Sequence, residues 1–150
     1  ASVGGFIAGS TELINYIQHN ARSLIFSASL PPASAGSVIA ALDIIESDPK
    51  PFENLWKNTH HAIARFKDLG MEIGKSETPI IPVYIRSNEK SFLISKMLFE
   101  KGVFVNPVIT PAVRPEDTLL RFSLMATHTI DMIDRAIDLI YESGKELGIY

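Results

Sequence analysis

Arg121 is the residue whose position is best suited to binding a small anion. It lies in the run Leu119–Met125, where Leu120, Phe122 and Leu124 alternate with other residues. This period-two pattern predicts a strand whose apolar side chains share one face, so Arg121 points away from the core. An arginine fixed on a strand can hold a carboxylate through two parallel hydrogen bonds. The alternative is an ordinary solvated strand arginine, which the spacing alone favours.

Ser27 and Ser29 form a second candidate site, because they flank Ala28 in a run that ends at Pro31 and Pro32. Their hydroxyls and the free backbone N–H groups of such a run are suited to hold a phosphate. The alternative is a strand end with hydrogen-bonding serines, and the local sequence favours it. Both interpretations remain open at this level.

Other common site chemistries are not indicated. The chain has no cysteine, which excludes disulfides, thiolate nucleophiles and zinc–thiolate sites. His60 and His61 are adjacent, so on a helix they diverge by about 100° and cannot share a metal ion. No metal site is therefore predicted. The formal net charge of −3 gives no basis for nucleic-acid binding.

Strands and helices alternate along the first third of the chain. We predict a short buried strand over 4–9, a helix capped by Ser10 and running to Asn20, an extended run over 23–30 and a buried helix over 33–47. Asp48-Pro49-Lys50-Pro51 is the clearest break in the pattern and predicts a domain boundary.

The remainder of the chain has the pattern of a small sheet covered by helices. We predict three helices. The first covers 52–69 and ends at Gly70, and the third begins at the Thr129 cap. The second covers 91–101, and its inward-facing residues are Phe92, Leu93, Met97 and Leu98. Strands are predicted over 71–73, 79–85, 103–105 and 119–125, with a proline-rich loop over 106–117. The predicted fold class is α/β, with α+β character in this second part.

Several blocks of the chain resemble a known family. The blocks are Gly4–Gly9, His19–Pro32, Thr78–Val83 and Leu120–Thr129. In sequence, order and spacing they are similar to the α-oxoamine synthases, which are fold-type I PLP-dependent acyl-CoA transferases. Among these, the blocks resemble bacterial serine palmitoyltransferases most. The resemblance implies that residues 1–48 end the large PLP-binding domain and that residues 49–150 form the C-terminal small domain, with an antiparallel sheet.

The resemblance also implies an activity. Members of the α-oxoamine synthase family condense an amino acid with an acyl-CoA and release CO2, with pyridoxal 5'-phosphate as cofactor. L-serine and palmitoyl-CoA are the expected substrates, which would make this the first step of sphingolipid synthesis. The alternatives are 8-amino-7-oxononanoate synthase and 2-amino-3-ketobutyrate CoA ligase. From other classes, the alternatives are a non-catalytic dimerisation paralogue and an independent α/β binding module.

Residue roles follow from the same resemblance. It assigns Ser27 and Ser29 to the cofactor phosphate, Arg121 to the substrate carboxylate, and Thr110 to a segment that closes over the substrate. Ile109 stands where some palmitoyltransferases carry a second arginine. The Schiff-base lysine is expected just upstream of Ala1, so this chain is predicted to lack a catalytic residue and to be inactive alone.

The resemblance further implies a homodimer with its active site at the subunit interface. A cytoplasmic location is expected. No apolar run in the sequence approaches the roughly 20 residues that cross a bilayer.

Overall fold

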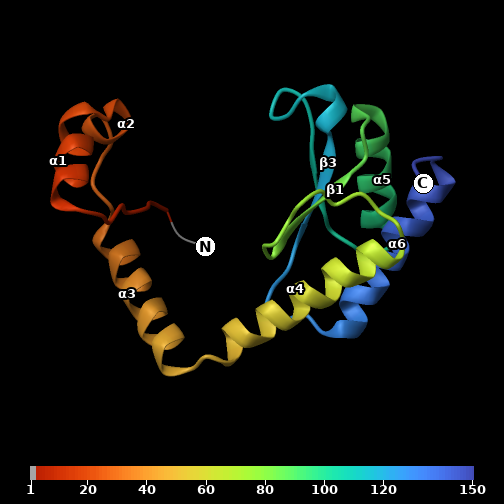
Figure 1. The fold of residues 1–150 in the computed structure, drawn as a ribbon, viewed down its shortest axis with the longest axis horizontal. Helices are drawn as coiled ribbons and strands as arrows, with labels where there is room; N and C mark the ends of the chain where they lie inside the picture. The colour runs from red at the N-terminus through yellow and green to blue at the C-terminus, as the bar shows by residue number, and fades with distance from the viewer. Residues whose placement is uncertain (1–2) are drawn as a thin grey trace. The chain divides into compact units, whose positions relative to one another are not determined.

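The chain divides into two compact units, Ala1–Asp48 and Pro49–Tyr150. The computed structural model describes residues 3–150 (Figure 1). The first unit consists of the helices α1 (Thr11–Asn20), α2 (Arg22–Ile25) and α3 (Pro32–Ser47). The Ser10 cap of α1 is confirmed, because its hydroxyl accepts a hydrogen bond from the backbone N–H of Leu13 at 3.3 Å.

The strands that we predicted in the first unit are wrong. Residues 4–9 have no regular structure, and residues 22–25 form the short helix α2 instead of an extended run. The helix is held by local bonds, from Ile25 N–H to the Ala21 carbonyl at 3.0 Å and from Phe26 N–H to the Arg22 carbonyl at 3.1 Å. A strand requires a paired neighbour, and the described part of this unit offers none.

Helix α3 was predicted correctly as a helix but wrongly as a buried one. Pro32 occupies its first turn, where a missing N–H costs no helical hydrogen bond. None of its residues is buried, and the same holds for α1 and α2. The described residues of the first unit therefore contain helices without a core.

The second unit contains three long helices and three strands. In chain order these are α4 (Lys50–Asp68), β1 (Ile80–Tyr84), α5 (Asn88–Glu100), β2 (Asn106–Val108), the 3-10 turn η1 (Pro115–Asp117), β3 (Leu119–Ser123) and α6 (Ile130–Glu146). Gly70 follows α4 with φ 70°, which confirms it as the residue that ends the helix. The Thr129 hydroxyl caps α6 by accepting from Met132 N–H at 3.3 Å.

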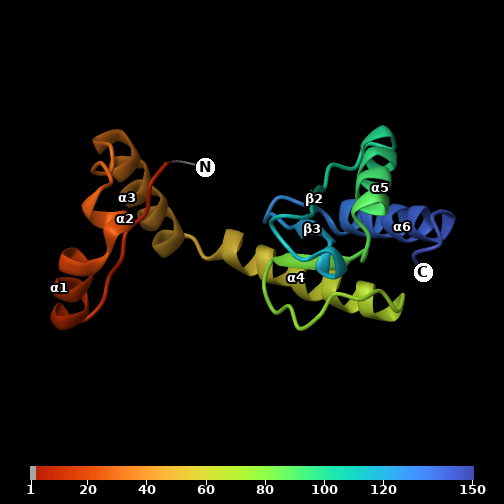
Figure 2. The ribbon, with the colours of Figure 1, turned by 90° about the horizontal axis from the view of Figure 1, so that it is seen from above.

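The strands form one antiparallel sheet in the order β1-β3-β2, as the predicted fold class requires. Ile81 and Val83 of β1 lie opposite Phe122 and Leu120 of β3, and their side chains are buried. Helices α4, α5 and α6 gather beside the sheet (Figures 1 and 2). Their buried residues include Phe66, Ile94, Leu98, Ile133, Ile137 and Ile140. The small antiparallel sheet covered by helices is therefore confirmed.

Two predicted strands of the second unit are wrong. Residues 71–73 form no ladder, although Met71 and Ile73 are buried and the Glu72 carbonyl accepts from Tyr84 N–H at 2.9 Å. The strand expected over 103–105 lies instead at Asn106–Val108, inside the segment predicted as loop. A proline at position 107 is tolerated there because β2 is an edge strand.

The inward face of α5 was also partly mispredicted. Leu98 is buried as expected, and Ile94 and Ser91 are buried beside it. Phe92 and Leu93 are exposed to 55% and 44%. Both faces of this helix carry large apolar residues, so periodicity does not choose between them.

None of the helices in the described part of the chain combines the length and apolar character that a bilayer crossing requires.

Candidate functional site

Arg121 lies at the centre of the sheet face that points away from the core. It is on the middle strand, directly opposite Pro82 of β1 and Asn106 of β2. Leu120 and Phe122, its neighbours along the strand, are buried, whereas Arg121 is exposed. The alternation predicted from the sequence is confirmed. Because β3 pairs with a strand on each side, the backbone of Arg121 is fixed, and so is the point from which its side chain extends.

The Arg121 guanidinium has no carboxylate partner among the described residues. Three other arginines of the second unit are paired, Arg65 with Asp138 at 2.7 Å, and Arg86 and Arg114 with Asp117 at 3.1 and 2.9 Å. No ion pair or hydrogen bond of the described side chains includes Arg121 or Arg135. These two guanidinium groups are therefore available to an external anion.

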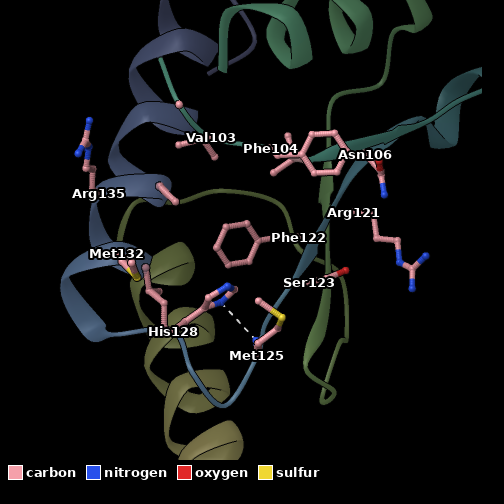
Figure 3. A pocket seen from close by; sticks show the side chains of 14 residues that line it. Val103, Phe104, Asn106, Arg121, Phe122, Ser123, Met125, His128, Met132 and Arg135 are labelled. Atoms are coloured by element: carbon pink, nitrogen blue, oxygen red, sulfur yellow. Dashed lines mark hydrogen bonds between the residues drawn. The ribbon is translucent and has the colours of Figure 1, made fainter. Parts of the chain in front are cut away.

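Two hollows adjoin Arg121. One is a cavity of about 770 Å³ between the β2–β3 side of the sheet and α6, and the Phe122 ring is part of its lining (Figure 3). The other, of about 670 Å³, lies over the open face and is lined by residues of the 75–78 loop and by Ile80, Pro82 and Leu119. Arg121 lines both, so it stands between two spaces that a ligand can enter.

The turn that follows β3 is fixed by Asn58, a residue that sequence reasoning missed. The Asn58 side chain, which is 4% exposed on α4, donates to the carbonyls of Met125 at 3.1 Å and His128 at 2.8 Å. Within the turn, His128 Nδ1 accepts from Met125 N–H at 3.2 Å (Figure 3). The structure therefore makes His128 part of this turn.

Thr110 lies beyond the end of β2, in the loop that leads to η1. Its hydroxyl accepts from the Asn88 amide at 3.3 Å, and its N–H donates to Asn88 Oδ1 at 3.3 Å. Asn106, the partner of Arg121, is four positions earlier in the chain, and Thr110 is exposed. The structure therefore ties Thr110 to the start of α5, and a role for it at the substrate stays a prediction.

Ser27 and Ser29 are in the first unit, after helix α2, and both are exposed. Ser27 already bonds within its own turn, because its hydroxyl and its N–H both donate to the Leu24 carbonyl, at 3.0 and 3.3 Å. Its hydroxyl is accessible, but it would have to rotate away from Leu24 to reach a phosphate. The phosphate-binding role of the two serines stays a prediction.

Acidic residues of α6 form ion pairs with α4. His61 Nε2 lies 2.6 Å from Asp134, and Arg65 binds Asp138 at 2.7 Å. The structure therefore gives His61 and these carboxylates a part in packing the two helices together. Among the described residues, no group of His, Cys, Asp or Glu is arranged to hold a metal ion.

The sequence and the fold agree with one known family. Residues 1–140 match the family model of aminotransferase class I and II, so the chain belongs to that family. Serine palmitoyltransferases are among its relatives. Those of Sphingobacterium spiritivorum and Bacteroides ovatus are 52% and 51% identical to it over 149 residues, or 99% of this chain. The 8-amino-7-oxononanoate synthase 1 of Bacillus velezensis is 37% identical over 147 residues.

The chain spans 37–38% of the length of these curated relatives. Solved structures agree with the sequence comparison. A structure of SPT with PLP matches with a TM-score of 0.81 at 26% identity, and covers 99% of this chain and 38% of that one. Serine palmitoyltransferase of Sphingomonas wittichii matches with a TM-score of 0.79 over the same shares. The resemblance inferred from the sequence is thereby confirmed.

Proposed function

We propose that this chain is part of a PLP-dependent α-oxoamine synthase that condenses L-serine with palmitoyl-CoA and releases CO2. The observation that carries the proposal is Arg121, an unpaired guanidinium held at the centre of an open sheet face. The names of the relatives at 51% and 52% identity support serine palmitoyltransferase activity. A homodimer with shared active sites, a cytoplasmic location and the assignment of units 1–48 and 49–150 to the large and small domains belong to the same proposal.

Arg121 would bind and orient the carboxylate of the amino acid. Its planar guanidinium offers parallel N–H donors that match both carboxylate oxygens. Holding this group in one direction fixes which bond of the α-carbon is aligned for reaction, which is a positioning role. The neighbouring Ile80, Pro82 and Leu119 are apolar and line the adjoining hollow. Apolar neighbours limit the water around the ion pair and so strengthen it.

Residues of the first unit would contribute to the cofactor site. Bound PLP supplies the electron sink that stabilises negative charge on the α-carbon of the amino acid. Ser27 fits a phosphate only in part, since its exposed hydroxyl must leave the Leu24 carbonyl before it can donate to a new acceptor. Ser29 is exposed and forms no described hydrogen bond, so its hydroxyl needs no such rearrangement.

A turnover assay with the whole protein that contains this chain tests the proposal. Serine, glycine and alanine are each offered with palmitoyl-CoA and with shorter acyl-CoAs, and released CoA and CO2 are measured. We expect the highest kcat/KM for serine with palmitoyl-CoA. A preference for alanine and a short acyl-CoA would instead favour the 8-amino-7-oxononanoate synthase alternative, which the 37% identical relatives support. No turnover with any pair would favour the non-catalytic paralogue.

Arg121→Gln and Arg121→Lys test the residue itself. We expect both substitutions to raise the KM for serine by about tenfold or more, because each loses the paired hydrogen bonds to the carboxylate. Arg114→Gln is the matched control, since Arg114 is also exposed in the second unit but pairs with Asp117. An unchanged KM in both Arg121 variants would remove Arg121 from the carboxylate site.

A further inference from the structure

We propose that Arg86 is a positioning residue for the amino-acid substrate, because it holds the loop between β2 and β3 beside the open sheet face. This loop covers residues 109–118. Val108, which precedes the loop, and Leu119, which follows it, both line the hollow that adjoins Arg121. The loop therefore borders that hollow. The inference rests on the proposed function, in which this hollow receives the amino acid.

The Arg86 side chain joins the end of this loop to the segment that follows α4. Its Nη1 atom donates to the Glu116 carbonyl at 2.7 Å and to Asp117 Oδ1 at 3.1 Å. Its Nε atom donates to Glu72 Oε2 at 3.2 Å, and its Nη2 atom donates to the other oxygen of the same carboxylate. The guanidinium also lies over the Tyr84 ring, 4.2 Å from the ring centroid. A single exposed ion pair contributes little, but a guanidinium that binds three groups at once is held in one orientation.

The backbone of Arg86 contributes to the same junction. With φ 64°, Arg86 is the one residue other than glycine among residues 3–150 that has a positive φ. A residue with a side chain is disfavoured in this region, so the surrounding contacts must stabilise it. The N–H groups of Ile85 and Arg86 both donate to the Thr118 carbonyl, at 2.9 and 3.0 Å. The backbone and the side chain of Arg86 together bind the last three residues of the loop.

The start of the loop is held from the same connection between β1 and α5. Asn88, two residues after Arg86, bonds through its side-chain amide to the hydroxyl and to the N–H of Thr110, both at 3.3 Å. In Figure 1 the loop lies at the end of the sheet where α5 begins. The two ends of the loop are therefore fixed by residues 85–88, and the second of these ends lies three residues before Arg121.

An ordered loop matters for binding because it borders the space that the amino acid enters. The apparent affinity of a ligand falls in proportion to the fraction of the protein that is in the binding-competent state. Loss of the Arg86 contacts frees one end of the loop and lowers that fraction. We therefore expect an effect on the KM for serine rather than on the rate of the bound complex.

Arg86→Gly in the whole protein that contains this chain tests the inference. Glycine adopts a φ of 64° without strain, so this variant removes the guanidinium and relieves the backbone at the same time. We expect the KM for serine to rise about fivefold and kcat to change by less than about twofold. A purely structural role would lower the melting temperature and leave the KM for serine unchanged, and that result would overturn the proposal.

Arg114→Gln is the matched control. Arg114 binds the same Asp117 carboxylate at 2.9 Å but belongs to the loop itself, so its loss leaves the link from the loop to β1 intact. The KM for serine of this variant should equal that of the unaltered protein. Asn88→Ala frees the other end of the loop, and its combination with Arg86→Gly should raise the KM above that of either single variant. Equal KM values for Arg114→Gln and Arg86→Gly would overturn the assignment to Arg86.

Hydrogen exchange of the same proteins separates this inference from the proposed function, because it needs neither PLP nor turnover. In Arg86→Gly, the backbone amides of residues 109–118 should exchange at least about fivefold faster, while those of α6 keep their rates. An unaltered protein that turns over no amino acid would reject the proposed function, and the exchange rates alone would then decide whether Arg86 holds the loop. Unchanged exchange over residues 109–118 would overturn the inference, whatever the kinetics show.

Discussion

Both units of this chain contain helices, but the units differ in how far those helices bury their apolar residues. In the second unit, α4, α5 and α6 bury Phe66, Leu98 and Ile137 completely beside the sheet. In the first unit, large apolar residues remain at the surface, including Phe26 at 81% and Ile39 at 61% exposure. Local sequence signals are therefore enough to form the helices of both units, whereas among the described residues a core is present in the second unit alone.

This difference separates two contributions to stability. Caps such as Ser10 on α1 and Thr129 on α6 are local and work equally in both units. Burial of apolar surface requires elements that are distant in sequence, and it supplies most of the stability of a domain. We therefore expect the second unit to resist unfolding and the first to depend on further contacts for its apolar surface.

The largest difference is expected in the thermal unfolding of the two units when each is prepared as a separate polypeptide. Residues 49–150 should unfold in one cooperative transition, whereas residues 1–48 should show no cooperative transition, because no residue of their described part is buried. Circular dichroism of both polypeptides during heating measures this. A sharp transition in residues 1–48 would contradict the comparison.

A pair of phenylalanine substitutions sharpens the comparison. Phe66→Ala should lower the free energy of unfolding by about 3–5 kcal/mol, because Phe66 is fully buried and packs edge-on against Phe122 at 5.2 Å. Phe26→Ala, in the first unit, should change it by less than about 0.5 kcal/mol. Urea denaturation of the 150-residue chain gives both values. Similar losses for the two variants would show that Phe26 is buried in solution.

Asn58→Ala tests the polar contact between α4 and the turn after β3. We expect a loss of about 1–3 kcal/mol in unfolding free energy, because two carbonyls lose their donor. Asn54→Ala is the control, since Asn54 is exposed on the same helix. Urea denaturation provides the measurement, and equal values for the two variants would remove the structural role of Asn58.

Two glycine substitutions, one in a helix of each unit, are expected to have the smallest effects on stability. Gly36→Ala should stabilise α3 by about 0.5–1 kcal/mol and so raise its helix content. Apart from the adjoining residues and the backbone of the helix itself, no atom lies within 4 Å of the added methyl. In Gly144→Ala the methyl would clash with the Tyr150 ring and move it away from Tyr141. The lost stacking, about 0.5–1.5 kcal/mol, should then cancel the helical gain.

Circular dichroism at 222 nm measures the helix content of the Gly36 variant. For the Gly144 variant, titration of the tyrosine absorbance provides a second readout. Burial raises the pKa of Tyr150 above its ordinary value, so displacement of the ring should lower it again. An unchanged titration would show that Tyr150 stays in place.

Features set by a few neighbouring residues could be predicted from the sequence. The outward direction of Arg121 followed from strict alternation in β3, and the starts of α1 and α6 followed from their caps. The bonds of Asn58 could not be predicted, because they join residues 67 and 70 positions apart. The strand expected over 4–9 depended on a pairing partner, and no property of the segment itself supplies one.

The pairing of β1 has a consequence for self-association. Its outer edge offers almost no free donor, because Pro82 has no N–H, Tyr84 N–H bonds to the Glu72 carbonyl at 2.9 Å, and Ile80 N–H faces the Thr78 hydroxyl at 3.4 Å. The Ile80 carbonyl is also occupied, by Ser76 and Thr78. A strand from another molecule would find no ladder to extend there, so this edge is protected against amyloid-like growth.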